Sequence, residues 1–100
     1  LKKFIESEVD KYSALMGLFP TGLRYTHVHT YWGTCASSGV LSFNMALRYT
    51  PEGTVSYVVV HELAHLRWKG HGPRFWAMVE KYYPRTKEMR KLLRSVPRSL

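Results

Sequence analysis

Residues 58–71 read VVVHELAHLRWKGH and contain the pattern His-Glu-x-x-His at His61, Glu62 and His65. At helical spacing the two histidines are four residues apart, so both imidazoles leave one face of the helix and can bind a single ion. Glu62 lies one position round that helix, where its carboxylate can hold a water without being a ligand. The pattern predicts a metal-dependent hydrolase with nitrogen ligands, an open coordination position and a general base.

The surroundings of this pattern favour a metal site over a pair of core histidines. Thr54 precedes an apolar run, and Gly70 is a typical C-terminal signal, so a mostly buried helix is predicted from there to about Lys69. His71 follows just past the predicted helix end, where the chain must reverse. It is therefore the predicted third metal ligand, which leaves a fourth position for water.

The length and composition indicate one small domain over residues 1–100. A chain of 100 residues with 45% hydrophobic content has room for a single core. No run of 18 apolar residues occurs, so we expect no contact with a membrane, and the charged first residues do not resemble a secretion signal. Cys35 is the one cysteine, which fits a reducing compartment. A cytoplasmic location is the expectation.

The net charge of +8 lies entirely in the second part of the chain. Residues 1–66 hold 5 basic and 5 acidic residues, whereas residues 67–100 hold 10 basic and 2 acidic residues. A solvated helical face is the preferred interpretation of this bias. A nucleic-acid partner is the weaker alternative, because no aromatic-interleaved binding motif accompanies the basic residues.

The hydrophobic pattern predicts helices and strands on both sides of the central helix. An amphipathic helix is expected over residues 1–16 and is ended by Gly17. Strands are expected at residues 23–31 and 40–47, and the turn residues between them favour a hairpin. Two more helices are expected at residues 73–83 and 85–96, after the prolines that open and separate them.

Several other residues are weaker candidates for chemistry. His27 and His29 lie two apart in a predicted strand. Exposed histidines are the preferred interpretation, and a metal-binding pair is the weaker one. For Cys35, a small and partly buried residue is the preferred interpretation, and a thiolate ligand or nucleophile is the weaker one. An oxyanion would need a donor beyond the metal. Five residues are equal candidates for that donor: Tyr82, Tyr83, His27, His29 and Arg74.

Four motifs in combination resemble a known family. These are WGTC at 32–35, VLSFN at 40–44, YVVVHELAHL at 57–66 and GHGPRFW at 70–76. Together they resemble YgjP-like metallopeptidase domains and their minimal relatives, the minigluzincins, over roughly residues 31–83. Metzincins also have a histidine six residues after HExxH, but they need a glycine three residues after the second histidine. Trp68 occupies that position here, which argues against a metzincin.

The resemblance implies a small zincin-like domain of the α+β class. Its parts would be an N-terminal backing helix, a small twisted sheet, the HExxH helix and C-terminal helices. Gluzincin-like peptidases usually take a glutamate as third ligand, whereas this subgroup has a histidine, which carries over onto His71. The implied activity is peptide hydrolysis by a Zn²⁺-activated water with Glu62 as general base. The substrate, a peptide or protein, would lie along an edge strand, expected at residues 40–47.

The resemblance also implies that the last segment, residues 84–100, is a candidate inhibitory element of a latent enzyme. Two alternatives stay open on sequence. One is a metal-dependent hydrolase of nucleotides or other phosphate esters, which converging Arg85, Arg90 and Lys91 would favour. The other is a nucleic-acid-associated domain with structural zinc and no catalysis, although structural sites usually have four ligands and several cysteines.

Overall fold

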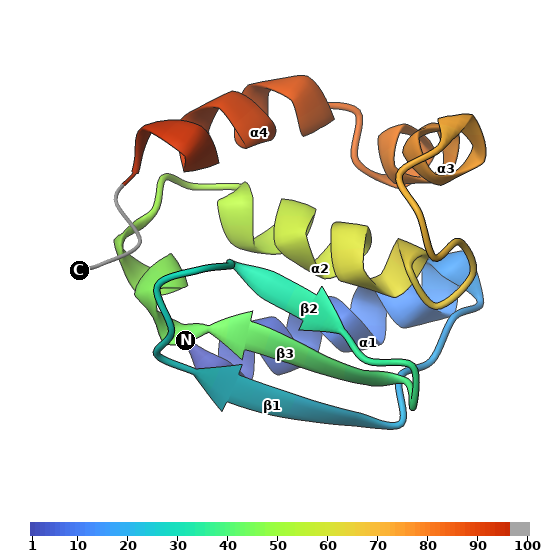
Figure 1. The fold of residues 1–100 in the computed structure, drawn as a ribbon, viewed down its shortest axis with the longest axis horizontal. Coiled ribbons are helices and arrows are strands. Elements are labelled where there is room, and N and C mark those ends of the chain that lie inside the picture. Colours follow the sequence, from blue (N-terminus) through green and yellow to red (C-terminus); the bar gives the residue numbers. More distant parts are fainter. Residues whose placement is uncertain (97–100) are drawn as a thin grey trace.

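The computed structural model describes residues 1–96 and confirms the α+β class (Figure 1). An N-terminal helix is followed by three short strands, a 3₁₀ helix and three further α-helices. In chain order the elements are α1 (Lys2–Met16), β1 (Gly22–Thr26), β2 (Gly33–Cys35), β3 (Val40–Asn44), η1 (Met45–Tyr49), α2 (Thr54–Ala64), α3 (Pro73–Tyr82) and α4 (Thr86–Ser95). No helix among the described residues is long and apolar enough to cross a membrane.

Helix α1 is the predicted backing helix. Its buried residues Ile5, Val9 and Tyr12 recur at helical spacing, so one stripe of the helix faces the core. Gly17 ends it in the left-handed region at φ 69°, a conformation that suits glycine. The helix packs against α2.

The sheet has the strand order β1-β3-β2, which differs from the predicted hairpin. Strand β1 pairs with β3 in parallel, with Leu23 opposite Leu41, and β2 pairs with β3 in antiparallel, with Thr34 opposite Ser42. The prediction that residues 23–31 and 40–47 form a hairpin is therefore wrong. The hairpin partner of β3 is instead the short strand at Gly33–Cys35, which lies within the segment interpreted as a turn.

One buried side chain explains why both predicted strands are shorter than expected. Asn44 is 0% exposed, and its amide donates to the carbonyls of Val28 (2.7 Å) and Tyr31 (2.9 Å). These bonds hold the chain after β1 in a loop rather than in a strand. The side-chain oxygen of Asn44, Oδ1, accepts a hydrogen bond from Ala46 N at 2.9 Å, which caps η1 and ends β3.

The new topology moves the free sheet edge near the central helix. Strand β3 is the middle strand and has a neighbour on each side. The expectation that residues 40–47 form the edge strand for a substrate is therefore wrong. Strand β2 is the edge strand next to α2 (Figure 1).

Helix α2 forms the centre of the domain, and α4 packs on it. Residues 57–60 and 62–64 of α2 are all buried. The helix ends at Ala64 rather than near Lys69, and i+3 bonds continue the turn, as from Leu66 N to Leu63 O at 3.0 Å. Met89 of α4 is fully buried and Leu93 nearly so, which makes α4 part of the core.

Candidate active site

The three predicted ligands converge at the C-terminal end of α2. His65 Nε2 and His71 Nε2 lie 3.2 Å apart, and His71 Nε2 and His61 Nε2 lie 3.4 Å apart. All the ligand atoms of the three residues lie within 4.8 Å of one another. Two nitrogens that bind one ion at about 2.05 Å with a tetrahedral angle would be about 3.3 Å apart. The donor set therefore fits a metal ion with imidazole ligands.

The other ring nitrogens of two histidines also have partners. His65 Nδ1 lies 2.9 Å from the backbone oxygen of Trp68, which can only accept, so neutral His65 carries its hydrogen on Nδ1. Its Nε2 is then free to bind a metal. His61 Nδ1 lies 3.0 Å from the Tyr57 hydroxyl, which comes from the preceding turn of α2. Such partners orient metal-binding histidines and set their tautomers.

Burial lowers the pKa of two of the three ligands. The pKa of His61 is lowered to about 3, mainly because burial disfavours the imidazolium, with the charges of the other two histidines adding to the effect. The pKa of His65 is also lowered, again mainly by burial. Neutral imidazole is the form that binds a metal, so proton competition for these two nitrogens is weak near neutral pH.

Glu62 lies beside the converging nitrogens without joining them. Its Oε2 is 4.0 Å from His61 Nε2, and the residue is only 5% exposed. Burial raises the pKa of this carboxyl to about 8, so it holds a proton near neutral pH when no cation is near. The contact with His61 is therefore not an ion pair. A bound cation would oppose the shift, which suits a group that must accept and release a proton.

The edge strand β2 approaches Glu62 closely because it carries a glycine there. A Cβ at Gly33 would lie 2.9 Å from Val58 Cγ1 and 3.0 Å from Glu62 Cγ. Ala36 N donates to Val40 O, and Asn44 N donates to Trp32 O. The alternation of an antiparallel pair then leaves the backbone N–H and C=O groups of Gly33 and Cys35 on the outer edge.

Two adjoining cavities contain His61 and Glu62. One, of about 270 Å³, also holds His65 and His71 and is bordered by β2. The other, of about 350 Å³, extends from Tyr31 and Trp32 to α4. Together they form a cleft with α2 as its floor and β2 and α4 as its two walls.

Comparison with known proteins assigns this arrangement to a family. The YgjP-like metallopeptidase domain matches the chain over residues 1–96. The chain belongs to this family. The metallopeptidase interpretation is thus confirmed, and His61, His65 and His71 form a three-histidine metal site with Glu62 inside the HExxH pattern.

Solved structures share the fold of this YgjP-like domain. The metallopeptidase zymogen abylysin of Pyrococcus abyssi matches with a TM-score of 0.77 at 24% identity, covering 91% of this chain and 94% of that one. The metallopeptidase zymogen jannalysin of Methanocaldococcus jannaschii matches with a TM-score of 0.75 at 17% identity, covering 90% and 94%. No curated protein sequence matches significantly.

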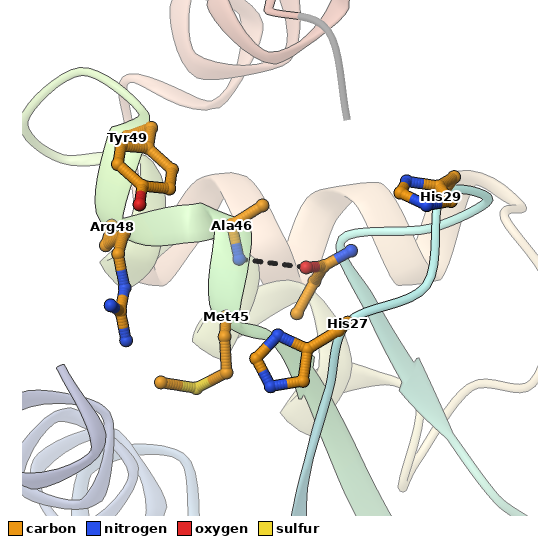
Figure 2. Close-up of a pocket in the computed structure, with 7 residues that line it drawn as sticks. His27, His29, Met45, Ala46, Arg48 and Tyr49 are labelled. Carbon is orange, nitrogen blue, oxygen red and sulfur yellow. Dashed lines mark hydrogen bonds between the residues drawn. The ribbon is translucent and has the colours of Figure 1, made fainter. Parts of the chain in front are cut away.

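His27 and His29 lie away from the triad. They line a separate cavity of about 340 Å³ beyond the ends of β1 and β3, together with Met45, Arg48 and Tyr49 among others. In Figure 2 the two rings are well separated, with His27 beside Met45 and His29 farther along the loop. Within residues 1–96, the only group of three or more potential metal-ligating side chains is the triad.

None of the five candidate oxyanion donors lines either cavity that contains His61 and Glu62. The Tyr83 hydroxyl donates to Gly53 O at 2.9 Å, and Arg74 borders a different cavity with Trp68. Cys35 does line the triad cavity, where burial, with Glu62 adding, raises the pKa of its thiol. Its sulfur is not among the converging ligand atoms.

Sequence reasoning missed the residues that surround the triad. Tyr57 lies four residues before His61, so helical spacing alone could have identified it as a partner. Tyr31, Trp32 and Arg94 enter the cleft from other elements, and no local signal marks them. Arg90 was considered only within the phosphate-ester alternative.

Proposed function

We propose that this domain is a zinc-dependent peptidase. The observation that carries the proposal is the convergence of three Nε2 atoms at 3.2 and 3.4 Å, with Glu62 beside them and an unpaired strand edge at the same cleft. Zinc is the metal best suited to a set of three imidazoles with one position left open. When bound, it supplies a Lewis acid that polarises a carbonyl and makes water more acidic.

Glu62 supplies the proton transfers of the reaction. Its Oε2 accepts a proton from the attacking water and afterwards donates it to the amine that leaves. Burial disfavours the charged carboxylate, which supports its taking the proton of the water. Gly33 allows the strand edge to lie next to this carboxylate, because any side chain there would meet Glu62 and Val58.

The proposed substrate is a peptide or protein in extended form. The outward N–H and C=O groups of Gly33 and Cys35 offer backbone hydrogen bonds to such a chain, as in β-augmentation. Their place beside Glu62 brings a paired peptide bond over the triad. The expectation of an edge-strand partner is kept, with β2 as the edge.

The phosphate-ester alternative has less support. Of the three basic residues that it requires, only Arg90 lines the cleft. Arg85 is instead bound to Glu88 by two hydrogen bonds of 2.9 and 2.8 Å. A purely structural zinc site is also disfavoured, since three ligands beside a buried carboxyl group resemble a catalytic site.

The decisive experiment compares Glu62→Gln with wild type after zinc loading. Peptides of mixed sequence are digested and the products identified by mass spectrometry, while zinc content is measured by elemental analysis. We expect Glu62→Gln to keep its zinc and to lose activity by about a thousandfold. Glu52→Gln, which changes an exposed glutamate, should retain both. Full activity in Glu62→Gln would remove Glu62 from the mechanism.

Latency through residues 84–100 is a further proposal. Abylysin and jannalysin are described as zymogens, and α4 forms one wall of the cleft here. Residues 97–100 lie outside the described residues. Removal of residues 84–100 would take Met89 and Leu93 out of the core, so we expect that truncation to unfold the domain. A chain that ends at Val96 keeps α4, and higher peptidase activity of that chain would support an inhibitory tail.

A further inference from the structure

The part of the cleft between β2 and α4 carries two arginines. This cavity of about 350 Å³ shares Gly33, His61 and Glu62 with the site, and its opposite wall includes Arg90, Leu93 and Arg94. Arg90 and Arg94 are four residues apart on α4, so they lie on one face of that helix. A peptide bond at the metal site would therefore place an adjacent substrate residue in the part of the cleft that Arg90 and Arg94 line.

The guanidinium of Arg90 packs on an aromatic ring. Its guanidinium lies 4.2 Å from the centre of the Trp76 ring, and that ring stacks on His71 at 5.7 Å with an angle of 29°. Stacking uses the flat face of a guanidinium and leaves the N–H groups at its edge available. Among residues 1–96, neither Arg90 nor Arg94 forms an ion pair with a carboxylate.

The cavity has little negative charge to balance these arginines. Among residues 1–96, Glu62 is the only acidic residue that lines it, against the two arginines. The remaining lining is aromatic or apolar, as at Tyr31, Trp32 and Leu93. Two cations with apolar walls are suited to a small anionic group attached to an apolar stem.

We propose that this cavity binds a carboxylate of the peptide substrate and that Arg90 and Arg94 hold it by charge-assisted hydrogen bonds. The inference rests on the proposed peptidase function and names its substrate class. An Asp or Glu side chain next to the scissile bond and the C-terminal carboxylate of a short peptide present the same chemistry. Both are planar acceptors that match the fork of a guanidinium.

The test uses the full zinc-loaded chain and four versions of one cleavable peptide. The peptide carries Glu or Gln beside the scissile bond, each with a free or an amidated C-terminus. We expect kcat/KM to fall about tenfold or more when the recognised carboxylate is neutralised. Loss on Glu→Gln identifies a side-chain carboxylate, and loss on amidation identifies the C-terminal one.

Matched variants attribute the preference to the cavity. Arg90→Met and Arg94→Met keep the apolar stem and should abolish the preference, and Arg90→Lys should restore only part of it, because lysine lacks the fork. Arg67→Met is the control: its guanidinium lies 4.1 Å from the Trp68 ring, and it does not line this cavity. Circular dichroism verifies that each variant is folded.

A binding experiment separates this inference from the peptidase proposal. The Glu62→Gln protein is titrated calorimetrically with the same four peptides, so hydrolysis is not required. At least about tenfold tighter binding of the carboxylate forms, lost in a Glu62→Gln/Arg90→Met double variant, supports the cavity even if no peptide is cleaved. Equal binding and equal cleavage of all four peptides would overturn it, whatever the activity of the enzyme.

Discussion

Two cavities of this small domain each combine histidine, arginine and tyrosine, yet only one of them is built as a metal site. In the cleft, His61, His65 and His71 direct their Nε2 atoms at one another. In the other cavity, the rings of His27 and His29 lie apart (Figure 2). Both cavities thus share residue types and have histidines close together in sequence, and the outcome differs.

The difference comes from what positions the histidines. His61 lies in the last turn of α2 and His65 caps its C-terminal end, and their Nδ1 atoms contact Tyr57 and the Trp68 carbonyl. His27 and His29 lie on a loop whose backbone is held by Asn44, and among residues 1–96 they form no group of three potential metal ligands. A metal site therefore requires convergence and oriented rings, and local histidine content does not supply either.

Loss of one ligand from each cavity should give the largest contrast. We expect His65→Ala to reduce zinc affinity by more than about a hundredfold, beyond the effect of losing an outer-shell partner. His29→Ala should leave the affinity unchanged. Zinc at about a hundred times its Kd should stabilise the wild-type and His29→Ala proteins by roughly 2.7 kcal/mol, measured by thermal unfolding, but not His65→Ala. Equal shifts in all three proteins would place the metal elsewhere.

A methyl group on the edge strand should harm the reaction without removing the metal. In Gly33→Ala the new Cβ must displace Glu62 or Val58, and a misplacement of about 1 Å can cost roughly a hundredfold in rate. Gly22→Ala at the opposite edge of the sheet is the matched control, since its Cβ would meet only Val40 at 3.8 Å. Peptidase rates and zinc content are compared, and a fully active Gly33→Ala would show that β2 does not position the base.

Asn44 tests whether the second cavity has a structural role. Asn44→Ala removes three hydrogen bonds of a fully buried side chain and leaves their partly buried backbone partners unpaired, so the free energy of unfolding should fall by about 2 to 4 kcal/mol. Denaturant unfolding of the metal-free protein measures this change. The zinc affinity of the folded protein should stay the same. A matching loss of zinc affinity would mean that the two cavities are coupled.

The smallest expected effect concerns the partner of His61. Tyr57→Phe leaves the buried His61 Nδ1 without its hydroxyl partner, and zinc affinity should fall by roughly tenfold. Tyr49→Phe changes an exposed tyrosine of the second cavity and should have no effect. Competition with a zinc chelator gives both affinities. If the two variants are equal, the Tyr57 contact does not orient the ligand.

The prediction of the site from sequence succeeded because its ligands are local. His61 and His65 are one helical turn apart, and His71 follows at the next chain reversal, so spacing alone brings them together. The strand pairing failed for the opposite reason. The parallel β1–β3 pair depends on Asn44 holding a loop 13 to 16 residues away, and tertiary contacts of that kind leave no periodic signal. A place for basic residues of α4 beside the metal was considered only in the phosphate-ester alternative, and of the residues named there Arg90 alone lines the cleft.

The shortness of β2 limits how a substrate can be recognised. Strand β2 spans only Gly33–Cys35, so at about 3.4 Å per residue it offers roughly 10 Å of backbone for pairing. Peptide residues beyond that footprint gain no ladder bonds from this sheet. Lengthening a substrate past about four residues should therefore improve kcat/KM little, and most discrimination between peptides must come from the side chains nearest the cleaved bond.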